Sequence, residues 1–202
     1  MNAKDRLFAL AERQQGFFTS KQAVECGVPR PNFHRKLRSG EWIKELRGIY
    51  RLAHYPVTDR PELVLWALWS RDKQDRPQGI WSHDTALDIH ELSDTMPSKM
   101  HMTVPPNFRK RSEIPKHLRL HFGVVEERDT ETWFGYQVTT PLRTIIDVIE
   151  EGALSPDLIE QAIRDGIRKG ILTLDDLNDN KHPLLQKYRD LYAHEYKIQK
   201  RD

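Results

Sequence analysis

The chain has 202 residues, of which 38% are hydrophobic and 31% are charged. This composition is typical of a globular protein with one large or two small domains. No apolar run approaches the ~20 residues of a membrane span, and the N-terminal segment lacks the apolar stretch of a secretory signal. Cys26 is the only cysteine, which excludes an internal disulfide. The sequence therefore predicts a cytoplasmic protein that does not contact a membrane.

Charge is unevenly distributed along the chain. Residues 1–60 carry 12 Lys and Arg against 6 Asp and Glu, whereas residues 61–202 carry 20 against 24. We call residues 1–60 the head and residues 61–202 the body. A basic head and a mildly acidic body suggest that the head binds phosphate groups and that the body binds a different partner.

The head has the element order of a winged helix-turn-helix. Gly27 supplies a tight turn between two short helices, and Pro31 fits the first turn of the second of these. Phe33 and Leu37 are four residues apart and should face the core. The predicted elements are helices at 4–14, 21–26 and 30–38 and strands at 42–46 and 49–52, joined by a turn at Arg47-Gly48.

The third predicted helix carries the candidate DNA contacts. Arg suits bidentate contact with guanine and Asn with adenine, and residues near the helix N-terminus usually reach the bases. The sequence therefore predicts base contacts from Arg30, Asn32 and Arg35. The remaining polar residues of this helix and of the wing are expected to hold the DNA backbone or the minor groove: His34, Lys36, Arg38, Lys44, Arg47 and Arg51.

The body begins after a connector that contains Pro56 and Pro61. We predict a domain boundary here, with a winged helix-turn-helix domain at 1–55 and an α+β domain with a helical C-terminus at 61–202. The expected helices lie at 61–72, 82–92, 140–152, 156–169, 173–178 and 184–199, and the expected strands at 99–104, 118–124 and 134–138.

A second group of cations lies between two predicted strands of the body. It is equally well interpreted as a solvated loop and as a second contact for DNA or for an acidic partner. Its members are Arg109, Lys110, Arg111, Lys116 and Arg119.

No catalytic or metal-binding motif is evident. His83 and His90 lie two turns apart on one predicted helix without a third ligand, and His101 and His121 would meet only if their strands pair. The acidic residues at 126–131 lack the lysine of a metal-dependent nuclease, and no phosphate-binding loop occurs. Asp147 is expected to form a surface ion pair with Arg143. We therefore expect a protein without a metal or cofactor and without enzymatic activity.

The head resembles the N-terminal domain of AbiEi-family antitoxins in RLFALAERQQGFFTSKQAVECGV (6–28) and LRGIYRL (46–52). The body resembles their second domain in SHDTALDIHELSD (82–94), KMHMTVP (99–105) and VTTPLRTIIDVIEEG (138–152). The resemblance implies a transcriptional autorepressor that binds operator inverted repeats in double-stranded DNA. It also implies an antitoxin domain that counteracts a nucleotidyltransferase toxin in a type IV toxin–antitoxin system. The alternatives are a DNA-binding nuclease and a ligand-sensing transcription factor.

Overall fold

The protein is a mixed α+β protein with two β-sheets, as predicted. A computed structural model describes residues 1–94, 97–179, 182–183, 185–186 and 188–189. The chain divides into two compact units: the first contains residues 1–80 and 132–137, and the second contains residues 81–131 and 138–202. None of the described helices has the length and apolar character needed to cross a membrane.

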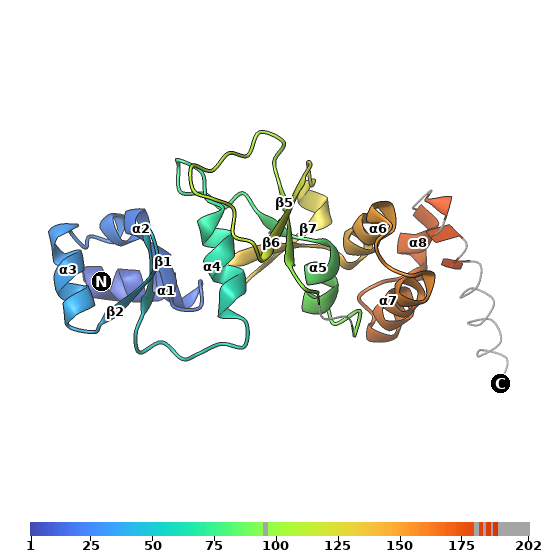
Figure 1. Cartoon of the computed structure of the whole chain (residues 1–202). Coiled ribbons are helices and arrows are strands. Elements are labelled where there is room, and N and C mark those ends of the chain that lie inside the picture. Colours follow the sequence, from blue (N-terminus) through green and yellow to red (C-terminus); the bar gives the residue numbers. More distant parts are fainter. Residues whose placement is uncertain (95–96, 180–181, 184, 187, 190–202) are drawn as a thin grey trace. The chain divides into compact units, whose positions relative to one another are not determined.

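The first unit begins with three helices and a three-stranded antiparallel sheet of order β1-β3-β2. This arrangement is consistent with the predicted winged helix-turn-helix. One strand, β1, was not predicted. The elements are α1 (Ala3–Glu12), β1 (Phe17–Thr19), α2 (Ser20–Glu25), α3 (Pro31–Arg38), β2 (Trp42–Leu46), β3 (Ile49–Leu52) and α4 (Pro61–Trp69) (Figure 1).

Side-chain caps fix where the first helices begin. Asn2 and Asp5 form a capping box at α1, and Thr19 and Gln22 form another at α2. In each box two free N–H groups gain acceptors, which stabilises the helix start. Helix α3 begins instead with Pro31 at its first position, where a missing N–H breaks no helical bond.

An aromatic cluster locks α3 and the wing to the rest of the head. The rings of Phe18, Phe33, Trp42 and Tyr50 contact one another with centroids 4.7–5.9 Å apart. Trp42 and Tyr50 are accordingly buried in the core of the head. The side chain of Val24 is 41% exposed, because Ala23 occupies the core-facing position of this short helix.

The first unit extends beyond the predicted residues 1–55. Helix α4 packs on β1 and β3, and residues 134–135 contact Gln14 and Gln15, which follow α1. Gln15 Nε2 donates to the carbonyl of Phe134 at 3.1 Å. A Cβ on Gly135 would lie 2.9 Å from Gln14 Cα, so only glycine allows this close approach.

The second sheet has five strands in the order β6-β5-β4-β8-β7. Strands β5 and β6 are parallel, with His101 opposite Arg119 and Thr103 opposite His121. The crossover between them is a 13-residue loop without a helix. The strands of this sheet are β4 (Ile80–Trp81), β5 (Met100–Val104), β6 (Leu118–Phe122), β7 (Thr130–Trp133) and β8 (Tyr136–Thr139). Helix α5 (His83–Ile89) follows β4, and a 3-10 turn (Glu127–Asp129) precedes β7.

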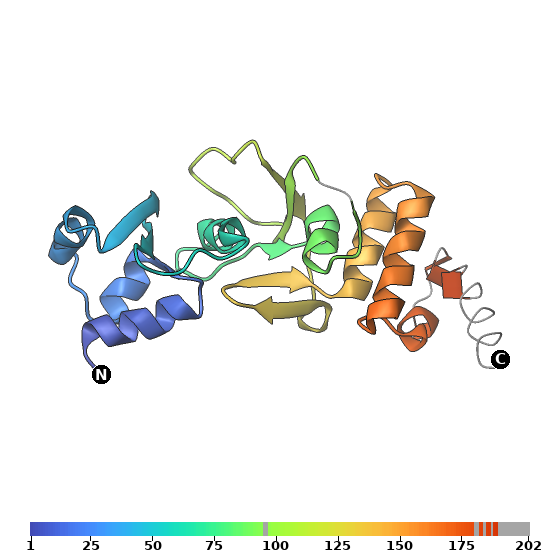
Figure 2. The ribbon, with the colours of Figure 1, turned by 90° about the horizontal axis from the view of Figure 1, so that it is seen from below.

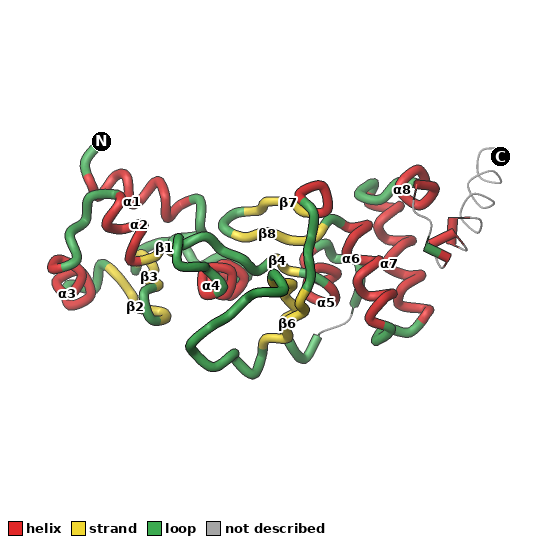
Figure 3. The backbone as a smooth tube through the Cα atoms, turned by 90° about the horizontal axis from the view of Figure 1, so that it is seen from above, coloured by secondary structure: helices red, strands yellow, loops and turns green. Residues whose placement is uncertain are grey.

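The chain then continues into a helical subdomain. Helices α6 (Pro141–Glu151) and α7 (Pro156–Lys169) lie side by side and are followed by α8 (Leu174–Asp179) (Figures 2 and 3). Their apolar faces form one core, which also includes Leu87 of α5. The helix predicted at 184–199 falls largely outside the described residues.

Candidate nucleic-acid interface

Helix α3 presents one face to the core and the others to solvent. Phe33 is buried and Leu37 packs against the same cluster, which anchors the helix through one face. Within the first unit, α3 lies on the side remote from α4 (Figures 1 and 3). The segment is helical and accessible, as a DNA-reading helix requires.

Three arginines of α3 and its N-cap are free of internal partners. Arg30, Arg35 and Arg38 are exposed, as is His34. Among the described residues, none of the three guanidinium groups forms an ion pair or a hydrogen bond. Their charge is therefore available to an external anion.

Two other predicted DNA contacts, Asn32 and Lys36, lie on a different side of α3 from the three arginines. Lys36 forms an ion pair with Glu41, and its side chain is only 22% exposed. The hydrogen bond from Lys36 is the main reason that the pKa of Glu41 is lowered. Asn32 and Lys36 both line a hollow beside Trp42 and Leu7 of α1. The structure therefore separates Asn32 and Lys36 from the exposed arginine face.

Three cations were predicted on the wing (residues 42–52). In the described part of the chain, two of them form no ion pair and the third is paired within the wing. Lys44 and Arg47 are exposed, and neither side chain has an internal ion pair among the described residues. Arg51, in contrast, pairs with Glu45 through Nε and Oε1 at 2.8 Å, and both side chains are 24% exposed. Its guanidinium also lies 5.9 Å from the centre of the Phe17 ring. Arg51 thus stabilises the wing from within.

A set of polar contacts that supports the turn between β2 and β3 was not predicted from the sequence. Arg71 Nη2 donates to the Arg47 carbonyl at 3.2 Å, and Arg71 Nε pairs with Asp75 at 2.9 Å. Asp75 in turn accepts a hydrogen bond from Thr19. Residues far along the chain therefore fix the turn that displays Arg47.

The second predicted basic group lies in the second unit and is partly engaged. Arg109 Nη1 donates to the carbonyl of Phe108 at 2.8 Å, and Lys110 Nζ lies 6.0 Å from the centre of the Phe108 ring. Arg119 pairs with Glu151. Arg111 and Lys116 are exposed in the β5–β6 loop. The five cations do not form one free patch.

The residues considered for catalysis are dispersed, with one exception. Glu126 and Glu127 are exposed, as expected of a solvated loop. His90 bonds the Thr139 carbonyl at 2.7 Å and does not join His83. His101 and His121 do meet, because β5 and β6 pair: their ring nitrogens Nδ1 and Nε2 are 3.3 Å apart.

Around this pair the second unit gathers a cluster of ionisable groups, which we call the histidine cluster: His83, Asp84, His101, His121 and Glu151. Burial, and then the neighbouring histidines, lower the pKa of His83 to about 3 and that of His101 to about 4. Burial also lowers the pKa of His121 and raises that of Asp84. Each of the three histidine pKa shifts favours the neutral form of the imidazole.

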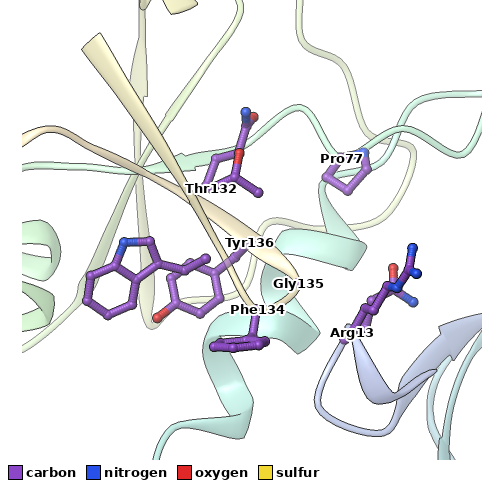
Figure 4. A pocket seen from close by; sticks show the side chains of 9 residues that line it. Arg13, Pro77, Thr132, Phe134, Gly135 and Tyr136 are labelled. Atoms are coloured by element: carbon purple, nitrogen blue, oxygen red, sulfur yellow. The ribbon is translucent and has the colours of Figure 1, made fainter. Parts of the chain in front are cut away.

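An open hollow in the first unit bears on the ligand-sensing alternative. Residues 132–137 line it together with Arg13, Gln14 and Pro77, and Figure 4 shows Arg13 across from Phe134. Phe134 is 74% exposed, so the hollow is shallow at this point. Three of the five tryptophans, Trp42, Trp69 and Trp81, are buried. Tryptophans thus fill cores here more than they line a pocket.

Residues 5–53 match the family model described as "Transcriptional regulator, AbiEi antitoxin". This match confirms the resemblance of residues 5–53 to that family and indicates an antitoxin or transcriptional regulator. Among solved structures, the chain is similar to the crystal structure of the RV2827C protein from Mycobacterium tuberculosis, at 12% identity and a TM-score of 0.49, covering 92% of this chain and 70% of that one. No curated protein matches the chain.

Proposed function

We propose that this protein is a DNA-binding antitoxin and autorepressor of a type IV toxin–antitoxin operon. The head is a winged helix-turn-helix that binds inverted repeats in the operator, and the second unit counteracts a nucleotidyltransferase toxin. In this account the protein acts in the cytoplasm by binding and without catalysis. The observation that carries the DNA-binding half is the exposed, unpaired arginine face of α3.

Charge and geometry suit this role. A helix in the major groove reads bases with side chains near its N-terminus; Arg30 is the N-cap of α3 and Arg35 lies in its second turn. An arginine fork matches the O6 and N7 acceptors of guanine. Arg38 at the end of α3, with Lys44 and Arg47 on the wing, is placed to hold phosphates on either side.

The two halves of the proposal can be tested separately in cells. A reporter gene is placed behind the operon's own promoter, and the toxin gene is induced from a second plasmid. The parent is expected to repress the reporter and to restore growth. Arg30→Ala with Arg35→Ala should relieve repression by about tenfold or more, since each lost base contact costs about 1–3 kcal/mol, and should leave growth rescue intact.

Arg13→Ala is the matched control, because it removes one exposed charge from the first unit outside α3. It is expected to repress as the parent does. Full repression by the double variant would refute the assigned DNA-reading helix. Failure of the parent to restore growth would refute the antitoxin assignment and leave the DNA-binding half standing.

A further inference from the structure

The histidine cluster brings together side chains from four elements of the second unit. His83 and Asp84 begin α5, His101 lies on β5, His121 on β6, and Glu151 ends α6. One ligand atom each from His83, His121 and Glu151 lies within 4.8 Å of the others, and the same holds for Asp84, His101 and Glu151. Such convergence from segments up to 68 residues apart indicates a built site.

Carboxylate oxygens in this cluster lack hydrogen-bond donors. The Glu151 side chain is nine-tenths buried, and its Oε2 accepts no hydrogen bond from any described residue. Asp84 Oδ1 is likewise buried without a donor in the described part of the chain. A buried acceptor without a partner costs about 1–3 kcal/mol, and more when it is charged. A cation bound between these carboxylate oxygens and the imidazoles would give the oxygens a partner.

The cations already present only partly offset these charges. Arg119 pairs with Glu151 Oε1, and its side chain is 49% exposed. His101 lies 3.9 Å from Glu151 Oε2 and 4.0 Å from Asp84 Oδ2, beyond hydrogen-bond distance in both cases. Two carboxyl groups therefore face one guanidinium. A divalent cation bound beside the donor-free oxygens of Glu151 and Asp84 would complete the charge balance.

Hydrogen bonds also orient His83 as a ligand. Its Nδ1 lies 2.9 Å from Ser82 Oγ, which accepts a hydrogen bond from Thr103 at 2.8 Å. A serine oxygen has two lone pairs, so it can accept from both partners, and His83 Nε2 then keeps a free lone pair. Metal-bound histidines characteristically donate their other N–H in this way. The His83 and His121 rings are stacked, with centroids 3.6 Å apart.

We propose that His83, His121 and Glu151 bind one transition-metal ion of the zinc class, with His101 and Asp84 beside it. Two imidazoles and one carboxylate form a ligand set that zinc accepts, with a fourth position left open. Donors about 2.0–2.1 Å from a tetrahedral ion lie roughly 3.4 Å apart. A ring nitrogen binds a metal in the plane of its ring, so binding requires one of the two stacked rings, His83 or His121, to rotate as the ligand atoms move to this spacing. This proposal departs from the expectation of no metal site and does not depend on the proposed DNA binding.

The test is a titration of the 202-residue chain, without a tag, with Zn²⁺, and the heat of binding is measured by calorimetry. One ion per chain is expected. His121→Ala and the isosteric Glu151→Gln should each weaken binding at least tenfold, the scale seen when a metal site loses a supporting group. His117→Ala removes an exposed histidine outside the cluster and should bind as the parent does. Arg119→Ala frees Glu151 and should tighten binding.

Two readouts keep the outcome decisive if a variant folds poorly. Circular dichroism verifies the fold of each variant, and the visible absorption of Co²⁺ bound to the parent reports a four-coordinate site with nitrogen and oxygen ligands. Failure of the parent to bind Zn²⁺ stoichiometrically would overturn the proposal. So would stoichiometric binding that survives both His121→Ala and Glu151→Gln with unchanged affinity.

Discussion

Asp147 is a carboxylate held inside the second unit by a single arginine. Its side chain is almost fully buried, and Arg143 Nε bonds its Oδ1 at 2.8 Å. The sequence predicted this pair correctly, since the residues are four apart on one helix. It was wrong to place the pair at the surface, because Asp147 is among the buried residues of α6.

Burial of Asp147 makes stability depend on pH. Burial raises its pKa to about 6, outweighing the opposing effect of Arg143. The folded state therefore binds a proton more readily than the unfolded state, so stability falls as pH rises from about 4 to about 6. Asp147→Asn cannot ionise, and its free energy of unfolding relative to the parent should rise by roughly 1–3 kcal/mol from pH 4 to 7.

Urea denaturation at several pH values measures this difference. Asp157→Asn, at an exposed position on α7, serves as the control and should show a profile parallel to that of the parent. If the Asp147→Asn profile also runs parallel to the parent, the buried carboxyl group is not responsible for the pH dependence.

The wing turn shows how an element depends on one backbone position. Gly48 has φ +74°, and a Cβ there would lie 2.9 Å from Arg71 Nη2. Gly40 has a similar φ of +71°, but nothing lies within 4 Å of the corresponding Cβ position. The two glycines share the left-handed conformation and differ in their surroundings.

Replacing each glycine with alanine separates these effects. Both variants should lose about 1–2 kcal/mol of stability from the left-handed conformation alone. Gly48→Ala should lose more, because it displaces the Arg71 guanidinium from the Arg47 carbonyl. Thermal denaturation measures both losses. Adding Arg71→Ala to Gly48→Ala tests for relief of the clash, and equal losses in the two single variants would exclude any effect of Arg71.

Elements with strong local signals were predictable from the sequence. The Thr19 cap, Pro31 and Pro141 mark helix starts that the structure places at α2, α3 and α6. Strands β1, β4 and β7 were missed, since such short segments show no clear periodicity. Their existence depends on tertiary pairing. The strand predicted at 134–138 is β8, which begins only at Tyr136 because residues 134–135 form the turn after β7.

The candidate sites were predictable to different degrees. The basic face of α3 follows from helical periodicity around Phe33 and Leu37. The pairing of Lys36 with Glu41, and of Arg51 with Glu45, depends on side-chain placement that spacing does not encode. The histidine cluster requires the parallel pairing of β5 with β6, and a loop without a helix gives no sign of such a crossover.

At the scale of the whole molecule, the charge distribution matches a division of tasks. The excess of cations falls within residues 1–60, and the three unpaired arginines of α3 lie within it. Binding that depends on phosphate neutralisation weakens as salt increases, because bound counterions are released. The central claim is therefore that α3 and its wing bind duplex DNA through these cations.

Fluorescence anisotropy with a labelled duplex from the operon's own promoter, repeated at several salt concentrations, tests this claim most directly. The parent should bind specifically, with affinity falling steeply as salt rises. Arg30→Ala with Arg35→Ala should lose about tenfold or more in affinity, while Arg13→Ala should match the parent to within about twofold. Equal affinities for all three proteins at every salt concentration would contradict the account.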